Sequence, residues 1–283
     1  MRELRNGKTF WGPLVQPVVC LLGFNQIPSE TSIKKQLRKI IYGSHLFCPR
    51  CHKREIYASE NRYRCRKCRK PFSLLSGTWL SAMKLNLRTF YALLWCWTQK
   101  IPVLQTQKLC HVGEQAVGYW FRQFRLHLPD MQPILSGKVQ MDEAYFRSLS
   151  LLMAKQVGTK KLAFQVINKN SVNKTEATQF IFQTVEPNSK LQTDGSGIYE
   201  KIEQWWQVEH KVDIHKKFEF GLTSEIEGTF GNLRTFIRRM YHHVTPTYLP
   251  EYVAEFALRF SHPEMFNSPY DYLSISLKSV PFD

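Results

Sequence analysis

Apolar residues recur at helical spacing between residues 86 and 127. Asn86 is a favourable N-cap for a helix over Leu87–Gln99. A second helix is expected over Val103–Cys110 and, after a break at His111–Gly113, a third over Glu114–His127. The apolar face of the third helix would consist of Val117, Trp120, Phe121 and Phe124.

Two helices joined by a short turn that contains glycine fit helix-turn-helix geometry. In that arrangement Arg122 and Arg125, which fall outside the apolar face, would contact DNA. A plain three-helix packing module without DNA contacts explains the same pattern.

Beyond residue 138, short apolar runs alternate with helical runs. Strands are expected at Lys138–Phe146, Leu162–Asn168, Ser189–Gly195 and Gln207–Ile214. Helices are expected at Thr175–Val185, Tyr199–Trp206 and Glu225–Met240, the last with Ser224 as its N-cap. The alternation predicts a mixed α/β domain.

The last of these helices has two distinct stripes. Its buried stripe would consist of Ile226, Phe230, Leu233 and Ile237. The adjacent stripe carries Glu227, Gly231, Arg234 and Arg238, and Arg234 lies about 10 Å along the helix from Glu227. Glu225 lies about 200° around the helix from Glu227 and therefore faces away from that stripe.

The net charge of the chain indicates what class of partner it binds. The chain has 283 residues, and 39 lysines and arginines outnumber 23 aspartates and glutamates, which gives a formal charge of +16. Such an excess favours a polyanionic partner, most often nucleic acid, although a basic protein can also be merely soluble. No apolar run reaches the roughly 18 residues of a membrane span, so no membrane partner is expected.

The longest apolar stretch, Gly12–Phe24, carries Pro13 and Pro17 and is interpreted as a packed N-terminal arm. Without a secretion signal, a reducing compartment is expected: the cytoplasm and nucleoid of a bacterium, or the nucleus of a eukaryotic host. The cysteines should then be thiols or metal ligands.

Four cysteines form two C-x2-C knuckles, Cys48 with Cys51 and Cys65 with Cys68. Two such knuckles can close a tetrahedral four-thiolate site that suits structural Zn2+. Residues 52–64 between them read as a short hairpin, so the unit is interpreted as a zinc ribbon. His45 and His52 are alternative ligands, but a surface or DNA-facing position is favoured for both.

The other cysteines, Cys20, Cys96 and Cys110, lack a partner at ligand spacing and are interpreted as packed thiols. The ribbon is also densely basic, which favours contact with phosphates. Its cations are Arg50, Lys53, Arg54, Arg62, Arg64, Arg66, Lys67, Arg69 and Lys70.

Three carboxylates occupy notable positions in this basic chain. Asp142 lies on a strand, Asp194 at the end of a later strand and Glu227 on the last helix. Carboxylates gathered in a low dielectric must protonate or bind cations, and oxygen ligands suit Mg2+ or Mn2+. Two such ions about 4 Å apart support in-line displacement at a phosphodiester. Because side chains alternate along a strand, Glu143 is expected to point away from Asp142.

The motifs VQMDEAYF, LQTDGSGIY, EIEGTFGNLR and MYHHVTPTYLPEYVAEFALRF follow the ribbon and the helical segment in this order. This arrangement resembles the zinc-ribbon DDE insertion-sequence transposases, the relatives of the eukaryotic Merlin elements. The similarity extends from about residue 30 to residue 262, and its most specific part is the pattern over Tyr252–Arg259.

The resemblance implies an RNase H-like catalytic domain that cuts and joins DNA at terminal inverted repeats in a Mg2+-dependent reaction. It places the catalytic residues on Asp142, Asp194, Glu227 and Arg234, and it implies double-stranded DNA as partner. A homodimer or higher oligomer is expected in the DNA complex. Two alternatives are a DNA-binding protein without catalysis, derived from such a transposase, and an RNase H-like nuclease that joins nothing.

The expected organisation has five parts. They are an N-terminal arm (1–40), the zinc ribbon (41–80), a helix-turn-helix-like segment (81–130), the RNase H-like domain (131–262) and a C-terminal tail (263–283).

Overall fold

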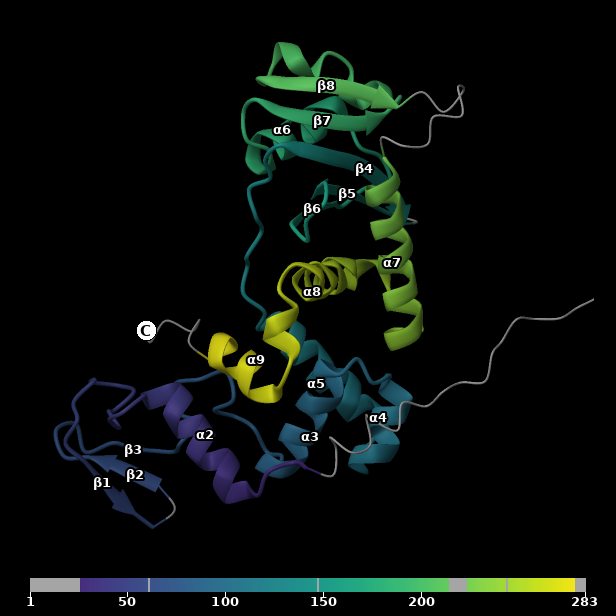
Figure 1. The fold of residues 1–283 in the computed structure, drawn as a ribbon. Helices are drawn as coiled ribbons and strands as arrows, with labels where there is room; N and C mark the ends of the chain where they lie inside the picture. The colour runs from purple at the N-terminus through teal and green to yellow at the C-terminus, as the bar shows by residue number, and fades with distance from the viewer. Residues whose placement is uncertain (1–25, 61, 147, 214–222, 243, 278–283) are drawn as a thin grey trace, which may run out of the picture.

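The structure is a computed structural model that describes residues 26–60, 62–146, 148–213, 223–242 and 244–277. The predicted arm Gly12–Phe24, Cys20, and Ile214 at the end of one predicted strand lie outside these residues. In Figure 1 the large sheet stands at one end of the molecule and a helical body with a small hairpin unit at the other.

The large sheet has the strand order β6-β5-β4-β7-β8. Strands β4, β5 and β6 pair antiparallel, whereas β7 and β8 are parallel to β4. This is the RNase H-like arrangement, as predicted. The strands span Lys138–Phe146 (β4), Leu149–Gln156 (β5), Leu162–Ile167 (β6), Ser189–Asp194 (β7) and Val208–Asp213 (β8).

Two elements differ from the sequence prediction. Strand β5 was not predicted, because all but its last residue are buried and the sequence therefore lacks the alternation of a half-exposed strand. The predicted helix Tyr199–Trp206 is wrong. Two short 3-10 turns, η1 (Gly197–Tyr199) and η2 (Ile202–Gln204), take its place, and Lys201 between them has a left-handed backbone with φ 59°.

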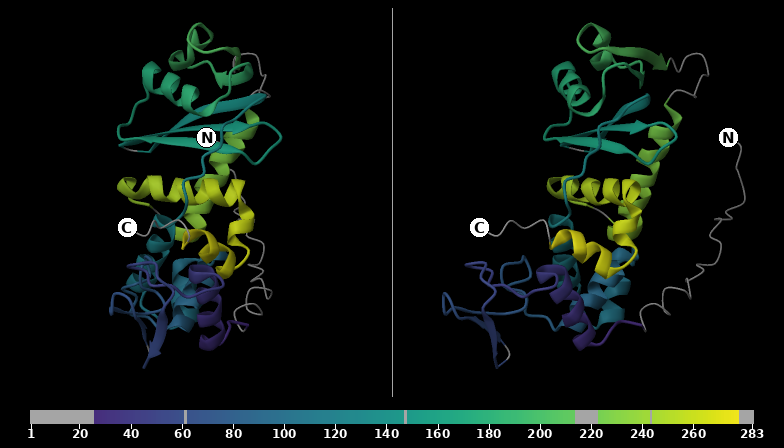
Figure 2. Two further views of the ribbon diagram at one scale, coloured as in Figure 1. Left: turned by 90° about the vertical axis from the view of Figure 1, so that its left-hand side faces the viewer. Right: turned by 60° about the vertical axis from the view of Figure 1, so that its left-hand side comes forward.

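Helices cover both faces of the sheet (Figures 1 and 2). Helix α6 (Lys174–Thr184) packs on one face through Ala177, Phe180 and Ile181. Helices α7 (Ser224–Tyr241) and α8 (Leu249–Ser261) pack on the other face. The predicted buried stripe of α7 is confirmed. Ile226, Phe230 and Leu233 are buried, and the half-buried Ile237 packs beside them.

The helical body forms a second core. It consists of α2 (Glu30–Tyr42), α3 (Leu87–Thr98), α4 (Val103–Cys110), α5 (Glu114–Leu126), η5 (Pro263–Phe266) and α9 (Pro269–Ser276). The Asn86 side chain caps α3 by accepting a hydrogen bond from Thr89 N at 2.8 Å, as predicted. Helices α4 and α5 form at the predicted positions and are joined by a short turn, with His111 in a left-handed conformation. Cys96 and Cys110 are packed in this core with their sulfur atoms 3.9 Å apart.

A buried charge network joins the helical body to α7 and α8. Arg259 on α8 donates to Glu255 Oε1 at 2.8 Å and to the carbonyl oxygens of Trp97 and Thr98 at the end of α3, at 2.6 and 3.0 Å. The Tyr241 hydroxyl donates to Glu255 Oε2 at 2.7 Å. Much of the family-like pattern over Tyr252–Arg259 therefore lies in a joint between two bodies.

The predicted DNA contact of Arg125 is wrong, because its side chain is buried in this joint. Its guanidinium lies 4.0 Å from the ring centre of Tyr252 and 3.7 Å from Glu255. Arg122 is also engaged within the protein, since it donates to both oxygens of Glu251 at 3.0–3.2 Å. The face of α5 that carries the two arginines packs against α8.

Among the residues that the structure describes, no helix is both long and apolar enough to cross a bilayer.

Candidate active site and zinc centre

The two cysteine knuckles have the same backbone geometry. In each, the N–H four residues after the first cysteine donates to its carbonyl, His52 N to Cys48 O and Arg69 N to Cys65 O, both at 2.9 Å. His52 and Arg69 have positive φ values of 57° and 58°, which close each turn. The ribbon strands β1 (Ile56–Ser59), β2 (Arg62–Cys65) and β3 (Pro71–Phe72) bring the second knuckle against the first.

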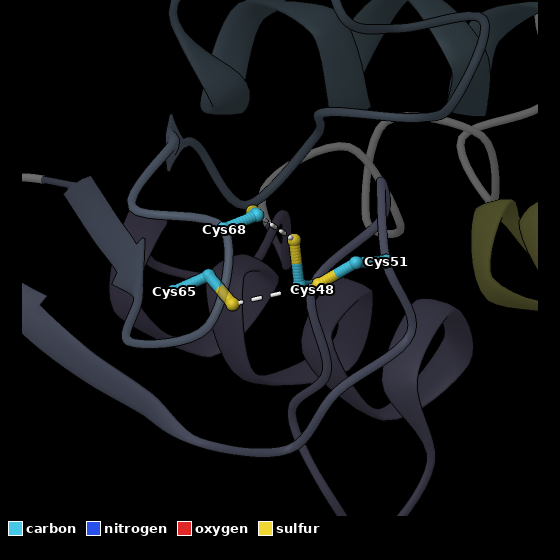
Figure 3. A group of neighbouring side chains, drawn as sticks. All are labelled: Cys48, Cys51, Cys65 and Cys68. Carbon is cyan, nitrogen blue, oxygen red and sulfur yellow. Dashed lines mark hydrogen bonds between the residues drawn. The ribbon is translucent and has the colours of Figure 1, made fainter.

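The four sulfur atoms point toward a common centre (Figure 3). Cys48 and Cys68 have sulfurs 3.6 Å apart, and so do Cys51 and Cys65. Thiolates bound tetrahedrally to one zinc ion at about 2.3 Å stand about 3.8 Å from one another. The spacing thus fits structural zinc, which the sequence predicted. His52 lies beside Phe47, with the two rings stacked at 6.0 Å, and is not part of the sulfur group.

We expect one tightly held zinc ion per chain. Because the ribbon has a small core of its own, removal of the ion by a strong chelator should unfold the ribbon and leave the sheet domain folded. Elemental analysis and circular dichroism before and after chelation measure both effects. A fully folded ribbon without zinc would contradict the assignment.

The acid cluster forms where β7 ends beside the middle of β4. These two strands pair in parallel only as far as Gln140 and Gln192. Continuing that register by two residues sets Asp142 beside Asp194, on the face of the sheet that α7 covers. Parallel strands thus bring the two predicted aspartates together.

Glu143 belongs to the same cluster, which corrects the sequence prediction. Oxygen atoms of Asp142, Glu143 and Asp194 all lie within 4.8 Å of one another. Alternation along β4 does send Glu143 toward the α6 face, but β7 no longer pairs with β4 at this point. The longer glutamate side chain therefore reaches the open end of the sheet, where the Tyr199 hydroxyl donates to Glu143 Oε2 at 2.5 Å.

Glu227 borders the cluster from the first turn of α7. It is exposed, and its Oε1 accepts from the Thr223 hydroxyl at 2.8 Å, outside the group whose oxygens lie within 4.8 Å. The same hydroxyl lies 3.3 Å from Oδ2 of Asp213, a buried carboxylate at the end of β8. Sequence reasoning missed Asp213, although its position at the end of a strand parallel to β7 was a usable signal.

The electrostatics of the cluster favour a bound cation. Burial, together with the charges of Glu143, Asp194 and Glu227, raises the pKa of Asp142 to about 6, against a lowering by the N–H of Glu143. Burial also raises the pKa of Glu143, although the hydrogen bond from Tyr199 opposes that shift. A divalent cation would relieve this repulsion between carboxylates.

Two further residues of α7, Glu225 and Arg234, have clear positions relative to the cluster. The Glu225 carboxylate forms an ion pair with Lys155 and accepts from Gly158 N at 3.2 Å, so it faces away from the cluster. Arg234 lies on the exposed side of α7 about two turns beyond Glu227.

An RNase H-like sheet with carboxylates on its first strand and at the end of its fourth strand defines the class of DDE polynucleotidyl transferases. Residues 147–261 match the ISXO2-like transposase domain, and residues 28–71 match the transposase zinc-ribbon domain. The first match includes Asp194, Glu227 and Arg234 and begins shortly after Asp142; the second includes all four knuckle cysteines. The chain belongs to the zinc-ribbon DDE insertion-sequence transposases.

Solved structures give a weaker likeness. The catalytic core domain of BIV integrase is 14% identical over 44% of this chain and 82% of that chain, with a TM-score of 0.31. The HTLV-2 integrase catalytic core domain in complex with magnesium is 12% identical over 46% of this chain and 88% of that chain, also at 0.31. At these scores the fold assignment rests on strand order and the family match. No curated protein matches the chain in sequence.

Proposed function

We propose that this transposase binds the terminal inverted repeats of its element and catalyses metal-dependent cleavage and joining of DNA strands. The observation that carries the proposal is the meeting of Asp142, Glu143 and Asp194 within 4.8 Å at the open end of the sheet, with Glu227 beside them. Carboxylates so placed suit Mg2+ or Mn2+.

Asp142, Asp194 and Glu227 are the proposed metal ligands, and Glu143 is a fourth carboxylate of the same site. When bound, the cations would activate the attacking oxygen and stabilise the leaving oxygen at a phosphodiester. The protein's own contribution is to hold these carboxylates on two parallel strands and one helix, where their charges are already close. Arg234 is proposed to steady a phosphate of the bound DNA.

The test is a cleavage and joining assay with labelled element ends and a target duplex, in Mg2+ and in Mn2+. Joined products support the transposase reaction. Cleavage without joining would favour the nuclease alternative, and binding without either would favour a DNA-binding protein that has lost catalysis.

A basic groove between α2 and the ribbon hairpin is the proposed contact with the DNA backbone. Its cations are Lys34, Lys35 and Arg38 on α2 and Arg62 on β2, and its cavity volume is about 410 Å3. Lys34 is paired with Glu30 at 2.8 Å, whereas Lys35 and Arg38 are exposed. The cations of α2 thus extend the basic surface that was expected from the ribbon residues alone.

Replacing both Lys35 and Arg38 with alanine should weaken binding to element ends. It should also flatten the dependence of log K on log salt by about one for each phosphate that the protein no longer neutralises. A matched control replaces Lys190 and Lys211, which share Glu209 on the far strands and carry the same total charge. Fluorescence anisotropy across a salt series measures both proteins, and equally weakened binding would mean that net charge alone matters.

A further inference from the structure

The N-terminus of α7 receives its cap from a distant strand. The predicted N-cap Ser224 is instead the first residue of the helix, and Thr223, which precedes it, makes no side-chain capping bond. The Gln140 side chain on β4 supplies the acceptor instead: its Oε1 accepts from Glu225 N at 2.9 Å and from Ile226 N at 3.0 Å. Gln140 is 3% exposed, so this amide is buried against the helix end.

This contact links the strand that carries Asp142 to the helix end that carries Glu227. Gln140 precedes Asp142 by two residues on β4, on the same face of the sheet. The two N–H groups that it binds lie two residues and one residue before Glu227. One amide oxygen thus ties the backbone of Asp142 to the backbone of Glu227. Because it accepts from two successive N–H groups, it restrains both the height and the rotation of the helix end.

Two further contacts hold the same helix end to other strands. Glu225 is paired with Lys155 of β5, whose side chain is buried. The Thr223 hydroxyl lies between Asp213 of β8 and Glu227. The Gln140 contact differs from both because it is neutral and comes from β4, the strand that carries Asp142 and Glu143.

We propose that Gln140 is a positioning residue of the DNA reaction: it sets the place of Glu227 relative to Asp142 and Asp194. A local serine or aspartate would satisfy the same N–H groups if helix stability were all that mattered. An acceptor taken from β4 also fixes the distance between two catalytic elements. The inference rests on the proposed function.

The test compares Gln140→Met with Gln140→Glu. Methionine keeps the length of the side chain without a strong acceptor, and glutamate keeps an acceptor that suits a helix N-terminus. Gln140→Met should cleave element ends at least about tenfold more slowly at saturating DNA, since small misplacements of catalytic groups are costly. It should also need more Mg2+ for half-maximal cleavage and bind the ends normally without metal. Gln140→Glu should recover most of the rate and the normal metal requirement.

Binding of Mn2+ to each protein without DNA, measured by calorimetry, separates the two proposals. Weaker binding by Gln140→Met than by the wild-type protein supports the positioning role, even if the wild-type protein cleaves nothing and the proposed function fails. Normal metal binding and cleavage by Gln140→Met, or equal defects in both variants, would overturn it. Should the methionine variant not fold, Gln140→Asn draws the acceptor back by one methylene and should show the same metal and rate defects.

Discussion

Asp142→Asn and Asp194→Asn are each expected to lower DNA cleavage and joining by about a thousandfold or more. The loss of one carboxylate charge weakens the cation site, which can remove several kcal/mol of transition-state stabilisation, and each ~1.4 kcal/mol is tenfold in rate. Binding to element ends without metal should be retained or tightened, because a negative charge near DNA has gone. A gel assay in Mg2+ and a binding assay without metal measure the two effects.

Glu225→Gln is the matched control on α7. Its carboxylate is bound by Lys155 and Gly158, away from the cluster, so the variant should keep substantial activity. Arg234→Ala should fall between this control and the aspartate variants. An inactive Glu225→Gln protein beside an active Glu227→Gln protein would show that the opposite face of α7 borders the active site.

The two glutamates near the cluster make a second comparison. The family resemblance favours Glu227 as the third ligand, whereas Glu143 lies closer to both aspartates in the structure. We expect both Glu227→Gln and Glu143→Gln to lose most cleavage, with the larger loss at Glu227. If Glu143→Gln cleaves DNA at the wild-type rate, the role of Glu143 is limited to its hydrogen bond with Tyr199.

Glu255→Ala is expected to lower the free energy of unfolding by about 3–5 kcal/mol, the usual cost of breaking a buried ion pair by removing one partner. Glu255 is fully buried, while Arg125 and Arg259 beside it are each 6% exposed. The change leaves two buried guanidinium groups short of their carboxylate and loosens the joint between α3, α5 and α8. Urea denaturation and the thermal midpoint measure the loss.

Glu209→Ala provides the comparison for this joint. Glu209 forms exposed ion pairs with Lys190 and Lys211 at 3.3 and 3.2 Å, and such pairs contribute little to stability because water screens them, so this variant should unfold almost as the wild type does. Tyr241→Phe removes one hydrogen bond to Glu255 and should cost about 1 kcal/mol. Similar stabilities for the Glu255 and Glu209 variants would show that the buried network does not hold the two bodies together.

Much of the fold was predictable because its signals are local. The C-x2-C spacing predicts a knuckle whatever surrounds it. The strand Lys138–Phe146 and the buried stripe of the last helix follow from periods of about two and 3.6 residues. Strand β5 and the turns near Lys201 were missed, because a strand buried on both faces has no alternation and a left-handed residue leaves no clear pattern.

The sequence by itself predicted the two cysteine knuckles, Asp142 on a strand and Asp194 at the end of a later strand, and the helical stripes that separate Glu227 from Glu225. Only the tertiary structure decided that Glu143 joins the cluster, that Arg125 is buried and that Gln140 caps α7. Each of these depends on residues far apart in the chain: the point where β7 stops pairing with β4, the packing of α8 on α5, and the approach of α7 to β4. Side-chain periodicity fixes which face a residue occupies, but the neighbours that end, cover or cap that face come from long-range packing.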